Sequence, residues 1–137
     1  MTALARPDRS PSLAPPDTPS VVAGHGRAAI LTGDGELIVR PAAEAAALLR
    51  GLPPPMLVHA PSTWRRLGLR PLPAYDLLEL FAFVLPARPA SPTPRGLALA
   101  LDLEPPGSGL EAAVAALPRL ARALLARLAA SRATALN

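Results

Sequence analysis

The sequence of 137 residues has no cysteine and no lysine, and only 3% of its residues are aromatic. Without cysteine, the chain can form no disulfide, no thiolate nucleophile and no cysteine-ligated zinc site. Without lysine, it cannot build the phosphate-binding loop Gly-x-x-x-x-Gly-Lys-Ser/Thr of ATP-driven motors. Because large rings are scarce, its core must be built from leucine, valine and alanine. These absences exclude thiol chemistry and an ATP-driven motor in this chain.

Long apolar runs are also missing. No stretch of about 18 residues is free of arginine, proline and acids, which predicts a soluble protein without a membrane partner. Residues 1–20 alternate proline, serine and charge without the apolar core of a signal peptide, so they predict a disordered leader. We therefore expect a cytoplasmic protein.

The charge balance is mildly basic. The net charge is +4, from 14 arginines against ten acids. A positive field attracts polyanions over about 8–10 Å, so contact with nucleic acid or an acidic partner is permitted. The arginines are dispersed rather than clustered, however, and a solvated surface is the simpler interpretation.

From Val21 onward the pattern predicts one domain that mixes strands and helices. Two β-rich runs joined by Gly-Asp-Gly predict an antiparallel hairpin, and a short apolar run predicts a buried strand; these are residues 27–32, 36–40 and 56–60. Start and stop signals predict helices at residues 41–50, at 63–68 after a Ser62 cap, after Asp76, from Pro94, and from 110 to about 128. The last of these is amphipathic, and Pro118 either kinks it or begins its second segment.

Asp76 and Glu79 lie at the start of the most apolar run, which makes them either helix caps or catalytic acids. An N-cap Asp76 would accept a hydrogen bond from the amide of the third helical residue, Glu79 would reach back, and Tyr75 would pack on Leu80. Two acids three residues apart supply neither a metal cage nor a nucleophile with its base. The capping interpretation is therefore the stronger one.

Other chemistry-bearing residues are few. Trp64, Arg65, Arg66 and Arg70 form the best nucleic-acid candidate, because an indole near guanidinium groups could stack a base while the arginines hold phosphates. The alternative is a helix whose tryptophan lies in the core and whose arginines are solvated. His25 and His59 are far apart in sequence and have no spaced partner for a metal.

Three motifs follow one another along the chain. They are Leu-Val-His-Ala with His59, Tyr-Asp-Leu-Leu-Glu-Leu-Phe-Ala-Phe with Asp76, and Pro-Thr-Pro-Arg-Gly-Leu-Ala-Leu-Ala-Leu from Pro92. Together they resemble the N-terminal domain of bacterial ATP-dependent DNA helicases of the DinG type, in which a DEDD exonuclease-like module of RNase H fold precedes the motor. The resemblance spans residues 21–130 and is clearest over 56–103.

The sequence departs from the pattern of active members of that family at every catalytic position. Those enzymes hold two divalent metals with four acids, because only several hard oxygen ligands keep Mg²⁺ ions about 3.5–4 Å apart. Here residues 25–32, taken as the first strand, carry no acid, Ala60 replaces the motif's asparagine, and residues 61–67 and 113–125 supply none. Asp76 matches a position that is not a metal ligand.

The resemblance therefore implies an α/β domain of catalytically degenerate RNase H-like, exonuclease-like fold. We expect a small mixed sheet, an antiparallel hairpin plus a parallel strand, flanked by helices over residues 21–131, with 132–137 as a tail or the start of a linker. It implies no catalytic residue, no metal and no cofactor in this chain; ATP and Mg²⁺ would belong to the helicase motor, a hydrolase. The implied partners are that motor domain in cis and single-stranded DNA, with no small-molecule substrate.

Two classes of function remain open at this point. The first is the non-catalytic leading domain of a DNA helicase. The second is a free-standing interaction module whose amphipathic last helix presents its leucine face to a partner. An active nuclease is a distant third.

Overall fold

A computed structural model of the chain describes residues 17–136. Most of the predicted leader lies outside these residues, but Ser20, its last residue, already belongs to the first strand. The strands are β1 (Ser20–Ala23), β2 (Arg27–Leu31), β3 (Leu37–Pro41), β4 (Met56–Leu57) and β5 (Tyr75–Asp76). The helices are α1 (Ala42–Arg50), α2 (Ala60–Leu67), α3 (Leu77–Val84), α4 (Pro94–Ala100) and α5 (Leu110–Leu136).

The strands form one five-stranded mixed sheet in the order β3-β2-β1-β4-β5. The first three strands are antiparallel neighbours, whereas β4 runs parallel to β1 and β5 runs parallel to β4. The predicted fold class, a small mixed α/β sheet flanked by helices, is confirmed. The sequence pattern did not predict β1, which lies at the centre of the sheet, or β5, which lies at one edge.

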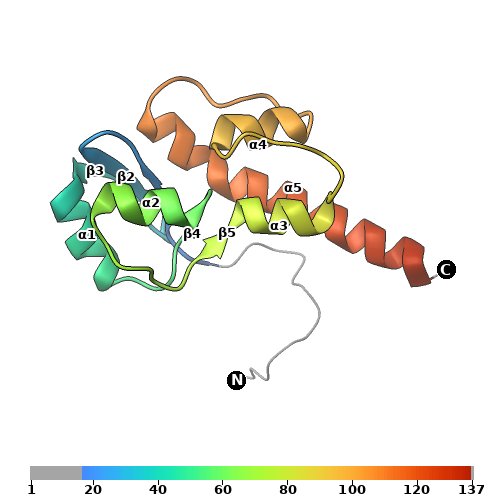
Figure 1. The fold of residues 1–137 in the computed structure, drawn as a ribbon, viewed down its shortest axis with the longest axis horizontal. Helices are drawn as coiled ribbons and strands as arrows, with labels where there is room; N and C mark the ends of the chain where they lie inside the picture. Colours follow the sequence, from blue (N-terminus) through green and yellow to red (C-terminus); the bar gives the residue numbers. More distant parts are fainter. Residues whose placement is uncertain (1–16, 137) are drawn as a thin grey trace.

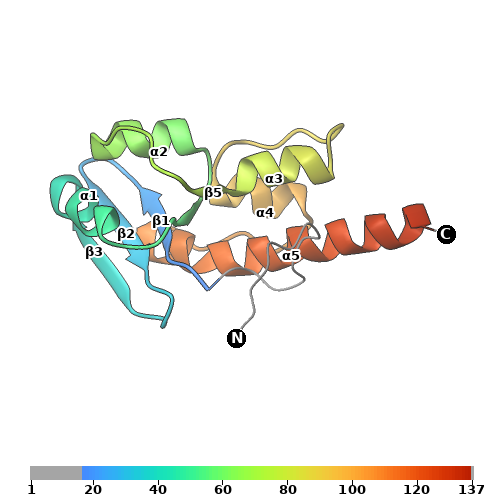
Figure 2. The same ribbon diagram turned by 90° about the horizontal axis from the view of Figure 1, so that it is seen from below.

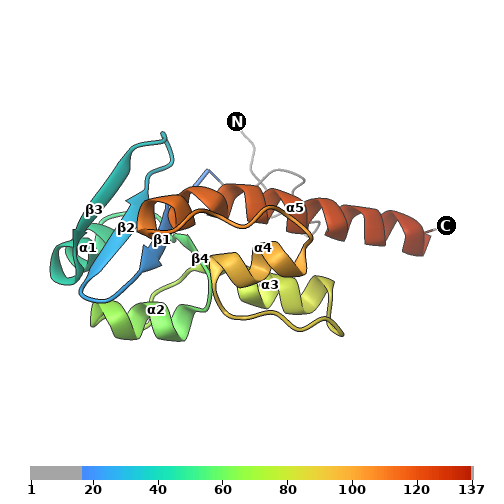
Figure 3. The same cartoon turned by 90° about the horizontal axis from the view of Figure 1, so that it is seen from above.

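Helices cover both faces of the sheet (Figures 1 and 2). On one face, α1 and α2 pack against side chains from β1, β2 and β4, including Val21, Ile30 and Leu57. On the other, α3, α4 and α5 pack against Met56 and Val22. Figure 3 shows α5 lying across β1, β2 and β3. Since successive residues of a strand point to opposite faces, even the short β1 contributes to both cores.

The hairpin of β2 and β3 forms as predicted, with Gly35 at a φ of 95° in the connecting turn. The cap predicted at Thr93 is also confirmed, because its hydroxyl accepts a hydrogen bond from the Gly96 amide at 2.9 Å. The predicted cap at Ser62 is wrong: α2 begins at Ala60, and its N-cap is His59. Pro41, expected at the first helical position, lies at the N-cap position of α1, and the helix begins at Ala42.

The C-terminal helix α5 is continuous over 27 residues and contains Pro118 in its interior. Its predicted apolar face is buried against the sheet and the neighbouring helices, with Val114, Leu117 and Leu124 at 0% exposure. It extends beyond residue 131, where we had expected the domain to end. No helix within residues 17–136 combines the length and apolar character needed to cross a membrane.

Candidate functional site

The most informative surface feature is a cleft at the carboxyl ends of β1 and β4. These two strands are parallel neighbours in the sheet. After β1 the chain goes on to β2, on one side of the pair, whereas after β4 it passes through α2 to β5, on the other side. In open α/β sheets, ligands bind in the crevice that such a reversal leaves outside the strand ends. The topology therefore singles out this cleft as the candidate site.

The cleft has a volume of about 410 Å³ and is lined by four segments that are far apart in sequence. These are the end of β1, the stretch from the residues after β4 through α2, the start of α4 and the start of α5. Its walls are largely apolar, and its polar side chains are those of His59, Ser62, Thr63, Arg66 and Thr93. None of the lining residues is acidic, so the cleft carries positive charge.

His59, which follows β4, has a left-handed backbone conformation with φ 66° and ψ 83°. This conformation is unfavourable for a residue with a side chain, so other contacts must hold it. The carboxylate of Asp76 accepts hydrogen bonds from the His59 amide at 2.9 Å and from the Ala60 amide at 2.7 Å. It also accepts one from the Leu78 amide at 3.0 Å. One carboxylate therefore fixes the starts of two helices, α2 and α3.

Hydroxyl groups inside the cleft are turned toward the backbone. Ser62 Oγ donates to the His59 carbonyl at 3.1 Å, and Thr63 Oγ1 donates to the same oxygen at 3.1 Å. The His59 Nδ1 atom lies 2.9 Å from Ser62 Oγ. Ser62 Oγ therefore lies between the His59 carbonyl and the His59 ring. The two hydroxyl groups therefore help to hold the left-handed backbone of His59.

Arg66 is the charged group of the cleft. It lies in the last turn of α2, and its NH1 atom donates to the Ala23 carbonyl, at the end of β1, at 2.9 Å. Because this acceptor is a neutral carbonyl, the guanidinium keeps its full positive charge. Arg66 was among the residues that the sequence had indicated for nucleic-acid contact.

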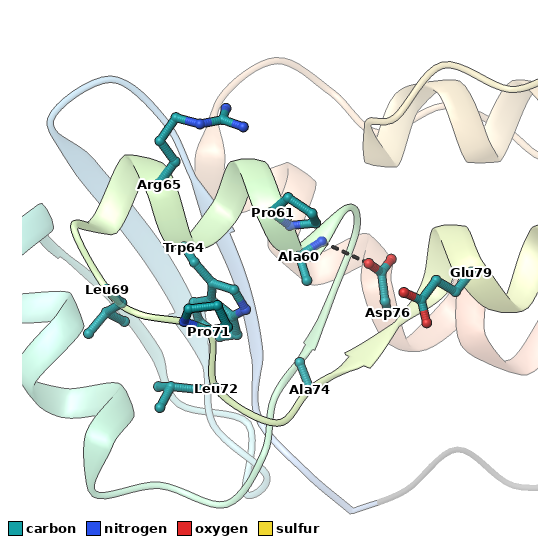
Figure 4. A pocket seen from close by; sticks show the side chains of 10 residues that line it. All are labelled: Ala60, Pro61, Trp64, Arg65, Leu69, Pro71, Leu72, Ala74, Asp76 and Glu79. Atoms are coloured by element: carbon teal, nitrogen blue, oxygen red, sulfur yellow. Dashed lines mark hydrogen bonds between the residues drawn. The ribbon is translucent and has the colours of Figure 1, made fainter.

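A second pocket, of about 510 Å³, lies on the other side of α2 (Figure 4). Its lining includes the side chains of Trp64, Pro71 and Leu72, with Asp76 and Glu79 at one end. Arg65 also borders this pocket, although in Figure 4 its side chain points away from it. Arg65 and Arg66, although neighbours in the sequence, therefore border different pockets.

The predicted grouping of an indole with three guanidinium groups is not present. Trp64 is only 3% exposed and packs in the core with α1 and the sheet, so it has no free face on which a base could stack. Position 64 falls on the inward side of α2, as in the alternative of a core tryptophan, and contact of the arginines with nucleic acid stays a prediction. Arg70 is exposed in the loop after α2 and borders neither pocket.

The capping prediction for Asp76 is confirmed, with a different partner. The carboxylate accepts from Leu78 rather than from Glu79, and Tyr75, expected to pack on the helix, is 48% exposed. The Glu79 side chain forms no hydrogen bond or ion pair with any described residue. The bonds from His59 and Ala60 could not be foreseen, because local capping rules do not extend to residues on another helix.

The first strand is β1 rather than residues 25–32, and it also carries no acid. Among the residues that the structure describes, no three His, Cys, Asp or Glu side chains lie close enough together to hold a metal ion. Comparisons with known proteins add no further identification: no protein-family model matches the chain, and no curated protein or solved structure matches it. What the chain does is therefore inferred from its geometry and from the resemblance in sequence.

Proposed function

We propose that this chain is a non-catalytic, exonuclease-like domain of an ATP-dependent DNA helicase, which acts by contact with DNA or with the motor domain. The five-stranded mixed sheet, an antiparallel meander on one side and parallel strands on the other, is compatible with the RNase H-like fold that the sequence resemblance implies. ATP and Mg²⁺ belong in this proposal to the motor domain alone.

One observation carries the proposal: the cleft at the carboxyl ends of β1 and β4 presents the guanidinium of Arg66 to a ligand. Two-metal hydrolysis of a phosphodiester needs several carboxylate oxygens that hold two cations close together. A fixed positive charge at the end of β1 repels such cations and attracts phosphate instead. The cleft therefore suits retention of a nucleic-acid strand without cleavage.

Incubation of the purified protein with 5′-labelled single-stranded DNA and either Mg²⁺ or Mn²⁺ tests the absence of catalysis. We expect no degradation above that of a preparation from cells carrying the empty vector. Degradation that purifies with the protein would refute the proposal. The genomic sequence beyond the codon for Asn137 tests the connection to a helicase, because an in-frame lysine-bearing phosphate loop supports it.

A free-standing interaction module is the second candidate, favoured by exposed apolar side chains on the outer helices. Phe83 on α3 is 73% exposed and Leu99 on α4 is 53% exposed. The leucine face of α5, which we had expected to bind the partner, is occupied within the chain. Under this proposal Phe83→Ser abolishes partner capture without changing DNA binding.

A further inference from the structure

We infer that Arg66 anchors a phosphodiester group of single-stranded DNA in this cleft, without any divalent cation. The inference rests on the proposed function and deepens it, since it names the anchoring residue, the ligand group and the independence from metal. The observations that carry it are the position of the guanidinium, the bonds of its neighbours and the walls of the cleft.

The position of Arg66 is fixed at both ends of its side chain. Its backbone lies in α2, and its NH1 atom is held by the Ala23 carbonyl at 2.9 Å. A guanidinium has five N–H donors in a planar fork, and one of them is used here. The ion pairs of the described residues are Arg40 with Glu44 and Arg88 with Asp102, so no carboxylate there neutralises Arg66. The group is therefore oriented and still able to bind an anion.

The neighbouring polar groups leave Arg66 as the main donor to a ligand. The Thr63 hydroxyl donates to the His59 carbonyl, and the Ser62 hydroxyl bonds to that carbonyl or to His59 Nδ1, so neither is free for a phosphate oxygen. The Thr93 hydroxyl oxygen accepts from the Gly96 amide, which leaves its proton available near the cleft. One fixed guanidinium and one available hydroxyl in the same cleft can bond to the two free oxygens of one phosphodiester.

The walls of the cleft fit the rest of a nucleotide. Val22, Pro92, Pro94 and Leu110 supply apolar surface around the charged group. Apolar walls can contact sugar and base without reading sequence, which suits binding that is independent of base identity. A volume of about 410 Å³ accommodates part of a single strand rather than a duplex.

Fluorescence anisotropy with a fluorescein-labelled dT12 oligonucleotide in excess EDTA tests the inference on the full chain. We expect the wild-type protein to bind equally well in EDTA and in a few millimolar Mg²⁺, once ionic strength is matched. Replacing Arg66 by methionine should raise the Kd about 5- to 10-fold at low salt. It should also lower the slope of log K against log salt by about 0.7, the value for one phosphate contact on single strands.

Arg65→Met is the matched control, because it removes the same charge from the next residue of the same helix, outside the cleft. We expect its Kd to stay within about 2-fold of the wild-type value. Arg66→Lys keeps the charge but loses the planar fork, so its Kd should fall between those of the wild type and Arg66→Met. Circular dichroism of each variant confirms that the fold is retained, and the lysine variant remains informative if Arg66→Met unfolds.

Three results would overturn the inference: equal effects of Arg65→Met and Arg66→Met, loss of binding in EDTA, or no binding by the wild-type protein. These outcomes are separate from failure of the proposed function. Metal-dependent degradation of the oligonucleotide would refute the non-catalytic domain itself. Absence of DNA binding without degradation would leave contact with the motor domain in place.

Discussion

Replacing Asp76 by asparagine tests how one carboxylate holds two helices together. In the native protein, its oxygens accept three backbone N–H bonds, from His59, Ala60 and Leu78, at 2.7–3.0 Å. Asparagine has one acceptor oxygen, and its NH₂ group faces the remaining donor. At least one amide then loses its partner, at a cost of about 1–3 kcal/mol, and the others lose the strengthening that a charged acceptor gives.

The unpaired amide costs about 1 kcal/mol, and each of the other two bonds loses about 1 kcal/mol when its acceptor becomes neutral. Asp76→Asn should therefore lower the free energy of unfolding by about 3 kcal/mol. Because Asp76 is half-buried, water can partly replace the lost bonds, and each loss lies at the low end of its range. For a domain of this size, such a loss lowers Tm by roughly 10 °C. Urea unfolding followed by circular dichroism measures the free energy, and hydrogen exchange of the Ala60 amide reports the broken contact directly.

Glu79→Gln is the control for this variant, because it removes the same charge three residues further along the same helix. Its side chain is exposed and has no hydrogen-bond partner among the described residues. We expect its effect to stay below about 0.5 kcal/mol. If Asp76→Asn is no more destabilising than Glu79→Gln, the carboxylate does not join the two helices and the account of the site's geometry fails.

Three further changes have definite expected outcomes. Gly96→Ala should destabilise the protein by about 1–3 kcal/mol in urea unfolding, although alanine is the better helix former, because its Cβ would lie 2.4 Å from the Ser91 carbonyl oxygen. Pro118→Ala should raise the free energy of unfolding by about 1–2 kcal/mol, because it restores an amide donor inside α5. The Thr32 hydroxyl, which hydrogen-bonds to Asp34, lowers the pKa of that carboxyl below its usual 3.8, and Thr32→Val should return the NMR titration midpoint of Asp34 toward 3.8.

Each of these outcomes has a result that contradicts it. A stabilising Gly96→Ala would show that the α4 start can shift away from the close contact. A destabilising Pro118→Ala would show that the ring contributes more by packing than it removes by hydrogen bonding. For Asp34, the charged form is favoured in the folded state, so the stability that it contributes is lost as the pH falls through its lowered pKa. An unchanged midpoint in Thr32→Val would exclude the hydroxyl as the cause.

Features that depend on neighbouring residues could be predicted from the sequence. The β2–β3 hairpin follows from its glycine turn, and the caps at Asp76 and Thr93 follow from side chains that bond to amides two or three residues away. The amphipathic face of α5 also follows from spacing alone, because a helix places residues three and four apart on one side.

Features that depend on distant residues could not be predicted. β1 and β5 are four and two residues long and form only because a neighbouring strand pairs with them. α2 starts at Ala60 rather than after Ser62 because the carboxylate that caps it comes from a residue 16 positions away. The sequence indicated Arg66 because it lies close to Trp64. Its proposed role in the cleft depends instead on the Ala23 carbonyl, 43 residues away.

The burial of α5 against β1 and β2 has a consequence for synthesis of the protein. Among the described elements, the strand at the centre of the sheet is synthesised before all others, and the helix that covers one of its faces is synthesised after them. That face remains uncovered and open to association with other nascent chains until Leu117, Leu120 and Leu124 have left the ribosome. Translation that stalls or ends before Leu124 should therefore yield a product that is captured by chaperones, whereas loss of residues after Leu128 should leave the folded body intact.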